Sequence, residues 1–235
     1  MPNPTHPMQG CYRTDMATTT KSASKKSIKT PKKLAEARAA DSTTSTRKPK
    51  SPKAHTISSK LAYNGRVFQV YTDKVQEPNG TINTRDVIRH NGSVVILAVD
   101  ESKNPNDPDI ILERQYRHAA GQFLLELPAG RVEPGESTLA AAKREMIEET
   151  GYRAKRWTLL TKYFASPGFL GEWMQIYLAR DIREGNAKPE PDEHIEIFRV
   201  PISEALGLIA AHKIHDGKTL IGLLLYDEAR RNGRI

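Results

Sequence analysis

Three glutamates, Glu145, Glu148 and Glu149, lie within five consecutive positions of one short segment of this sequence. Carboxylates three or four positions apart on a helix share one face and repel each other. They also lie towards the C-terminal end of the helix that the segment predicts, where the helix dipole disfavours negative charge. A hard divalent cation such as Mg²⁺ removes both penalties, because it binds oxygen ligands together with waters and substrate phosphates. These residue types therefore predict metal-assisted chemistry on a phosphate compound.

The segment around the glutamates, STLAAAKREMIEET, consists mostly of strong helix formers. Ser137 or Thr138 is a suitable N-cap, and Gly151 is a typical C-terminal stop. Helical periodicity places the glutamates beside an apolar stripe made of Leu139, Ala142 and Met146. The acids then border the core, where unbalanced charge is costly. The alternative interpretation is a solvated acidic face on which Arg144 pairs with Glu148 at i,i+4.

Short β-rich segments flank this helix and define the elements that must position it. The predicted strands, separated by turn sequences such as EPNG and NPNDPD, are 66–72, 83–90, 93–99, 110–115, 157–164, 174–180 and 195–200. Two helical patterns, 203–211 and 218–231, end the chain. Strands on both sides of a helix imply a mixed α/β or α+β sandwich.

Basic residues gather in the first quarter of the chain. Residues 1–60 contain 13 Lys or Arg against 3 Asp or Glu, whereas the remaining 175 residues contain 23 against 25. The net charge of +8 is therefore a property of the N-terminal segment. Its Lys, Ser, Thr, Ala and Pro residues bury too little apolar surface to offset the entropy of ordering. We predict a disordered basic tail over 1–55 and one folded domain over 56–235, which begins with a small antiparallel sheet over 56–90.

The tail has two interpretations, a solvated extension or a weak contact with nucleic-acid phosphates, and the absence of aromatic residues from 18–60 favours the first. Either Met1 or Met16 is the initiator. The lone cysteine, Cys11, excludes an intrachain disulfide. No apolar run is long enough to span a bilayer, and residues 1–30 lack the apolar core of a secretory signal. We expect a cytoplasmic protein, with an organelle transit peptide as the alternative.

The stretch from residue 130 to residue 152 resembles the Nudix box, in which G, five residues, E and seven residues precede R-E-U-x-E-E-x-G-U, with U a bulky aliphatic residue. The matching positions are Gly130, Glu136, Arg144, Glu145, Met146, Glu148, Glu149 and Gly151. Tyr152 departs from the aliphatic preference and Met146 departs mildly, but neither position carries a ligand. A match at this many fixed positions is far more specific than a lone glycine-rich triplet.

The resemblance implies a Nudix hydrolase, an enzyme that cleaves nucleoside diphosphates linked to another moiety. The implied fold class is α/β, a Nudix α/β/α sandwich with a mixed sheet, preceded by the small N-terminal antiparallel sheet. Carried over by position, Glu145 and Glu149 are the principal ligands of Mg²⁺, or of Mn²⁺ in its place. Glu148 joins the metal cluster, Arg144 orients the glutamates, and the backbone carbonyl of Ala129 matches a further ligand position.

The residues around the box resemble the branch of the family that acts on ADP-ribose and nucleoside diphosphate sugars. The stretch ERQYRHAAGQFLLELPAG matches the R-Q-Y-R and E-L-P-A-G elements of that branch, and SPGF follows the box at the distance typical of the branch. Guanidinium groups suit phosphates and ribose hydroxyls. The substrate-binding candidates are Arg114, Arg117, Glu126, Pro167, Gly168 and Phe169. The alternatives are surface arginines at 114 and 117, and a buried ion pair of Glu126 with a local arginine.

The branch takes its catalytic base from a mobile loop after the box, here within KPEPDEHIEIFRV. Glu193 matches best, with Glu190 and Glu196 as alternatives, and the prolines of this segment favour a loop. A plain acidic surface loop explains the segment equally well. Closure of such a loop brings a base onto the attacking water only when substrate is bound.

The activity that the resemblance implies is Mg²⁺-dependent hydrolysis of ADP-ribose to AMP and ribose 5-phosphate. Relatives dimerise by exchanging N-terminal strands, so a homodimer is expected, and Tyr63, Phe68 and Tyr71 are possible platforms for adenine. The alternatives are other nucleoside diphosphate sugars or dinucleotides such as NADH and FAD, and RNA-end processing aided by the tail. A module that senses a nucleotide without cleaving it is opposed by the intact box.

Overall fold

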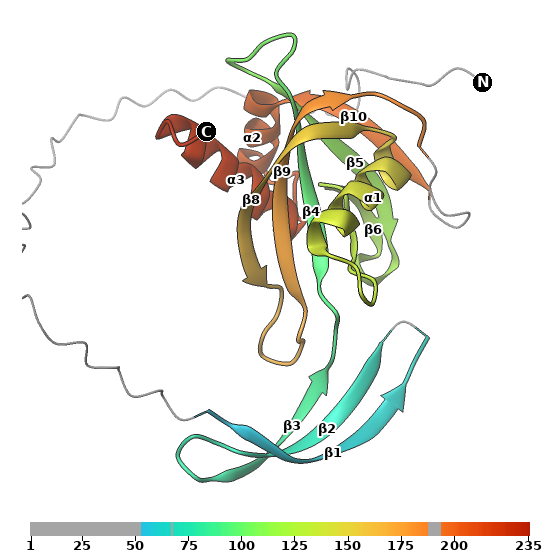
Figure 1. Cartoon of the computed structure of the whole chain (residues 1–235), viewed down its shortest axis with the longest axis vertical. Coiled ribbons are helices and arrows are strands. Elements are labelled where there is room, and N and C mark those ends of the chain that lie inside the picture. The colour runs from blue at the N-terminus through green and yellow to red at the C-terminus, as the bar shows by residue number, and fades with distance from the viewer. Residues whose placement is uncertain (1–52, 67, 188–193) are drawn as a thin grey trace, which may run out of the picture.

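The chain forms two separate sheets (Figure 1), and the computed structural model describes residues 53–66, 68–187 and 194–235. The first sheet is antiparallel, with β1 (His55–Asn64), β2 (Gln69–Gln76) and β3 (Ile82–Ile88) in that order. It lies apart from the rest of the domain and is joined to it through the connection from β3 to β4. The predicted tail lies almost wholly outside the described residues, as do Glu190 and Glu193.

The main sheet has the order β10-β5-β4-β9-β8, with β6 beside β5 and β7 beside β4. Its strands are β4 (Ser93–Asp100), β5 (Asp109–Arg117), β6 (Gln122–Glu126), β7 (Ala129–Arg131), β8 (Arg153–Phe164), β9 (Trp173–Arg183) and β10 (Ile195–Pro201). Strands β4 and β9 run parallel, whereas β4 and β5 run antiparallel, so the sheet is mixed. A short 3₁₀ turn, His118–Ala120, joins β5 to β6.

Helices cover both faces of the main sheet. Helix α1 (Thr138–Thr150) packs on one face, and α2 (Ile202–Ala210) and α3 (Gly217–Arg231) pack on the other (Figure 1). Alternate residues of β4 enter the two cores, so its whole apolar run is buried. The predicted α/β/α sandwich with a mixed sheet and a small antiparallel sheet before it is confirmed. No helix in the described ranges is long and apolar enough to cross a membrane.

Strand β1 was missed by the sequence analysis, which placed the first strand at 66–72. All ten residues of β1 are exposed, and its register with β2 shifts twice, between Thr56 and Ser58 and between Leu61 and Tyr63. Such bulges interrupt the alternation of polar and apolar residues by which a half-buried strand is recognised. Strand β7, only three residues long, carries too short a pattern to be recognised.

The caps predicted for the glutamate helix are present. The Ser137 side chain accepts a hydrogen bond from the Ala140 N–H at 3.2 Å, and Gly151 ends α1 with a left-handed φ of 75°. Space also requires glycine there, because a Cβ at position 151 would lie 2.6 Å from the Ala187 backbone nitrogen. Both ends of α1 are therefore set by local sequence.

Helix α3 begins at a cap that reaches across to the segment before the box. Asp216 accepts hydrogen bonds from the Thr219 N–H at 3.0 Å and from the Thr219 hydroxyl at 2.6 Å. The same hydroxyl accepts the Leu127 N–H at 2.7 Å, and Thr219 is fully buried. The start of α3 thus satisfies a backbone donor two residues before Ala129.

Thr219→Val tests this contact, because valine has a similar size and no hydroxyl. The buried Leu127 N–H then lacks its acceptor, and we expect the free energy of unfolding to fall by about 1–3 kcal/mol. Urea denaturation measures the change. Thr219→Ser keeps the hydroxyl and serves as the control, with a smaller loss. Equal stability of the valine variant and the wild type would show that this hydrogen bond adds nothing.

Candidate active site

The three glutamates of α1 line one cavity but differ in exposure. Glu149 is 5% exposed, and the side chains of Glu145 and Glu148 are 13% and 41% exposed. The cavity has a volume of about 570 Å³. Its other lining residues are Arg89, His90, Asn91, Arg117, Ala129, Gly130, Arg131, Val132, Glu133, Pro134 and Arg144. The helix thus presents a graded row of carboxylates between the core and the open cavity.

Arg144 holds two of these carboxylates and ties them to the turn before α1. Its Nη1 donates to Glu145 at 2.8 Å and to Glu148 at 2.9 Å, while Nε and Nη2 donate to Glu136 at 3.2 and 3.1 Å. The Arg131 carbonyl accepts a further hydrogen bond at 3.1 Å. The hydrogen bond with Glu136, with the charges nearby, raises the pKa of Arg144. The i,i+4 pair of Arg144 with Glu148, considered from sequence, is therefore one part of a larger network in which Arg144 binds three glutamates.

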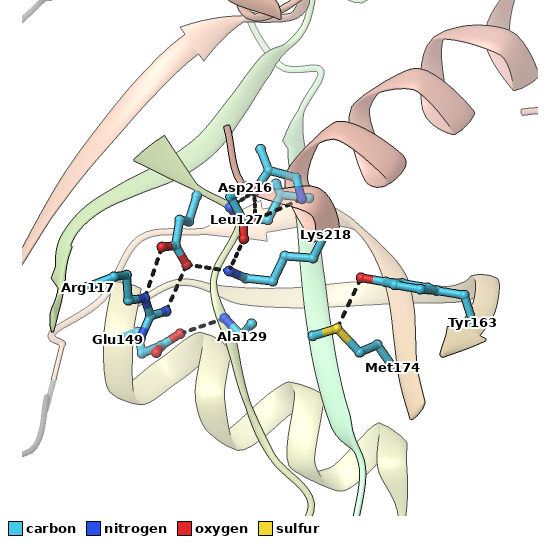
Figure 2. Close-up of polar contacts among 10 residues, drawn as sticks. Arg117, Leu127, Ala129, Glu149, Tyr163, Met174, Asp216 and Lys218 are labelled. Atoms are coloured by element: carbon cyan, nitrogen blue, oxygen red, sulfur yellow. Dashed lines mark hydrogen bonds and ion pairs between the residues drawn. The ribbon is translucent and has the colours of Figure 1, made fainter. Parts of the chain in front are cut away.

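Backbone approaches the box glutamates closely from strand β7. A Cβ at Gly130 would lie 1.9 Å from the Glu145 carboxyl carbon, so no larger residue fits there without moving Glu145. The Ala129 N–H donates to Glu149 Oε2 at 3.1 Å, a contact visible in Figure 2. Strand β4 fixes β7 through the pairs Val94 with Gly130 and Val95 with Ala129. The buried central strand thereby sets the distance between the Ala129 backbone and the carboxylates.

Arg117 reaches the cavity from the end of β5 and is held by Glu126. Its Nε and Nη2 donate to the two Glu126 oxygens at 2.9 and 2.8 Å, and Glu126 is 1% exposed. Burial alone would raise the pKa of Glu126, but the hydrogen bond from Arg117 and the charge of Lys218 outweigh it and keep that pKa below its ordinary value. The hydrogen bond with Glu126 likewise raises the pKa of Arg117. The buried pair considered for Glu126 is therefore present.

Other predicted site residues lie outside this cavity. Arg114 pairs with Glu196 at 3.2 Å, both side chains being about two-fifths exposed, and its guanidinium lies 4.2 Å from the centre of the Phe123 ring. Phe169 is 54% exposed, in a loop that hydrogen-bonds to the end of β3. Pro167 and Gly168 precede it in the same loop and do not line the cavity. Their predicted roles in binding substrate stay predictions.

Three lining residues, Arg89, His90 and Asn91, were missed by the sequence analysis. They connect the small sheet to β4, and Arg89 donates to Asp73 at 2.9 Å and lies 4.0 Å from the centre of the Tyr71 ring. A hydrogen bond with Ser59 lowers the pKa of Asp73, and the arginine lowers it further. No motif marks this stretch in the sequence. Only the arrangement of the two sheets brings it to the cavity.

The donor atoms at the cavity suit a hard divalent cation. Among the described residues, no group of three or more His, Cys, Asp or Glu side chains is arranged to hold a metal ion unaided. Mg²⁺ does not require such a cage, because it commonly takes one or two carboxylates and completes its shell with waters and substrate phosphates. Glu145 and Glu149 beside the Ala129 backbone offer an oxygen set of that kind.

Comparisons with known proteins agree with this geometry. A NUDIX domain model matches residues 89–221. The chain is 36% identical over 173 residues to the ADP-ribose pyrophosphatase of Bacillus subtilis, which covers 72% of this chain and 90% of that protein. It is 34% identical over 170 residues to the methanol dehydrogenase activator of Bacillus methanolicus, covering 72% and 89%. It is 33% identical over 154 residues to the GDP-mannose pyrophosphatase of Citrobacter koseri, covering 58% and 77%.

The fold is also found among solved structures. A crystal structure of an ADP compounds hydrolase matches with a TM-score of 0.66 and 23% identity, over 78% of this chain and 97% of that one. The domain match spans the main sheet and the box helix, and the relatives are similar over most of their own length. The chain therefore belongs to the NUDIX domain family and is a Nudix hydrolase.

Proposed function

We propose that the protein hydrolyses the diphosphate of ADP-ribose to AMP and ribose 5-phosphate with Mg²⁺ as its cofactor. The observation that carries the proposal is one cavity in which the box carboxylates face Arg117. Carboxylates supply the ligands for a divalent cation, and a guanidinium group binds phosphate through paired hydrogen bonds. Similarity to an ADP-ribose pyrophosphatase supports the choice of substrate.

In this proposal Glu145, Glu149 and the Ala129 carbonyl hold the metal, with Glu148 contributing. The bound metal would neutralise phosphate charge and lower the pKa of a water. Arg144 fixes the positions of two of the carboxylates, because it donates hydrogen bonds to both Glu145 and Glu148. The carboxylates are therefore held in place before a metal or substrate binds, so little reorganisation would accompany the reaction.

The chemical step is attack of water on one phosphorus of the diphosphate. A new P–O bond forms, the bridging P–O bond breaks, and the departing phosphate carries the bond's electron pair. We propose Glu193 as the base that accepts the proton of the water, with Glu190 and Glu196 as alternatives. Arg117 binds the diphosphate in this proposal. Arg114, Glu126 and the loop of Pro167, Gly168 and Phe169 do not line the cavity, and we keep them as candidates for contact with the rest of the substrate.

Other nucleoside diphosphate sugars are the second candidate class. Similarity to a GDP-mannose pyrophosphatase favours them, although that match covers a smaller share of this chain than the match to the ADP-ribose pyrophosphatase. The methanol dehydrogenase activator is named for its effect on another enzyme and so favours neither substrate. All three matches cover more than three quarters of the relative's own length, and we expect the choice of sugar to depend on residues beyond the box.

We also propose that the protein acts as a homodimer, joined through the small sheet. Three strands with two largely exposed faces bury little apolar surface by themselves. The exposed large apolar residues of this sheet and its first turn are Ile57, Leu61, Tyr63, Phe68 and Ile82, each 44–56% exposed. Several large apolar side chains exposed on one small sheet favour an interaction surface there.

Glu149→Gln tests the metal site, because it keeps the shape of the side chain and removes its charge. We expect kcat for ADP-ribose to fall at least about a hundredfold, since lost stabilisation of several kcal/mol corresponds to two decades or more. Glu204→Gln, an exposed glutamate of α2, is the matched control and should leave kcat unchanged. Full activity of the Glu149 variant would remove the basis of the proposed mechanism.

A substrate panel separates the candidate activities. Phosphate released after phosphatase treatment is measured for ADP-ribose, GDP-mannose, NADH and FAD, with Mg²⁺, with Mn²⁺ and with EDTA. We expect kcat/KM to be highest for ADP-ribose, Mn²⁺ to substitute for Mg²⁺, and EDTA to abolish turnover. An enzyme that ignores ADP-ribose would refute the substrate, and one that is indifferent to EDTA would refute the cofactor.

Glu193→Gln tests the proposed base. Loss of a general base slows proton transfer, so kcat should fall by about 10²–10⁴-fold, and the acidic limb of its pH profile should change. Glu190→Gln is the matched control from the same segment and should retain the wild-type profile. If instead the Glu190 or Glu196 variant shows the large loss, the base is assigned to the wrong glutamate.

A further inference from the structure

The first turn of α3 makes a polar junction with the segment just before the box. Lys218 Nζ contacts the Glu126 carboxylate and lies 3.1 Å from Asp216 Oδ1. Figure 2 shows the Lys218 side chain extending from the start of α3 toward Arg117, with Asp216 beside it. Helix α3 lies outside the glutamate box and packs on the opposite face of the sheet from α1. The junction therefore connects the second helical layer to the active site.

These charges are deeply buried. The Lys218 side chain is 9% exposed and the Glu126 side chain 1%. A buried ion pair contributes little net stability, because desolvation of both charges offsets their attraction. Stability alone is therefore a weak reason for a lysine at this place. Arg117 is the member of the junction that also lines the cavity.

Glu126 is shared between two cations. Arg117 binds both of its oxygens, and Lys218 contacts Oε2, the oxygen that also accepts from Arg117 Nη2. If Arg117 were the only partner, the charge of Glu126 would offset most of its positive potential. Asp216 Oδ2 accepts the Thr219 N–H and hydroxyl at the start of α3, while its Oδ1 lies beside Lys218. Lys218 thus supplies the second positive charge that Glu126 requires.

We propose that Lys218 is a positioning residue for substrate binding. By taking part of the Glu126 charge, it holds the carboxylate in place and leaves Arg117 oriented and cationic toward the diphosphate. Lys218 acts through Glu126 and Arg117 without contact with the substrate. The proposal rests on the proposed function, in which Arg117 binds the diphosphate, and it adds a determinant from outside the box.

Lys218→Met removes the charge and keeps the length of the side chain. We expect KM to rise about three- to thirtyfold, within the range that couplings inside one network produce, with kcat unchanged. Calorimetric titration with the same compound, in EDTA so that it is not hydrolysed, should show the same rise in its Kd. Lys218→Gln also removes the charge but keeps a side chain that can donate a hydrogen bond to Glu126. It serves if the methionine variant fails to fold, and it should show the same rise in KM and Kd. Lys155→Met, on the exposed face of β8, is the control and should change neither value.

A double-mutant cycle with Glu126→Gln tests whether Lys218 acts through Glu126. Once Glu126 is neutral, Lys218→Met should raise KM no further, whereas independent effects would multiply. Each comparison uses the compound that the wild type hydrolyses fastest. If that compound is not ADP-ribose, the wild-type assay shows it, and the comparison between variants still tests the role of Lys218. Unchanged KM and Kd in the folded methionine and glutamine variants, or multiplicative losses in the cycle, would overturn the proposal.

Discussion

Carboxylates at the edge of an apolar core depend on donors that face them, and this constraint organises the site. Glu145 and Glu148 share Arg144, and Glu149 accepts the Ala129 N–H. The Ala129 N–H to Glu149 and the hydrogen bond from Arg144 to the Arg131 carbonyl join α1 to β7, so the helix and this strand form one unit. A divalent cation bound there would meet carboxylates whose positions are already set, which would lower the cost of binding it. In the proposed mechanism, such a cation would relieve the mutual repulsion of the glutamates.

The segment from Glu126 to Arg131 lies between the two helical layers. Its end faces α1 through Ala129 and Gly130, and its start meets α3 through Glu126 and Leu127. Strand β4, buried on both faces, pairs with this segment and fixes its path. The box helix, Arg117 and the C-terminal helix therefore all contact this one short segment.

Much of the fold could be predicted because its signals are local. The predicted strand at 93–99 is β4 nearly in full, and α1 has the predicted caps, since a buried apolar run and a Ser-to-Gly helix frame do not depend on distant contacts. Strand β1 was missed because bulges break its pattern. Arg114 and Arg117 were both candidates from sequence, with Arg117 preferred, and their odd spacing along a strand sends the two side chains to opposite faces. Arg89 reaches the cavity through the placement of a second sheet, which no local pattern encodes.

Binding of Mn²⁺ observed by electron paramagnetic resonance tests the central claim most directly, because it reports the metal without turnover. Free Mn²⁺ is titrated with wild-type protein and with the variant Glu145→Gln/Glu149→Gln, in the presence and absence of AMP. The account predicts that the wild type depletes the free-ion signal and that the variant, folded to the same extent, loses most of this binding. Equal Mn²⁺ affinity in both proteins would contradict it.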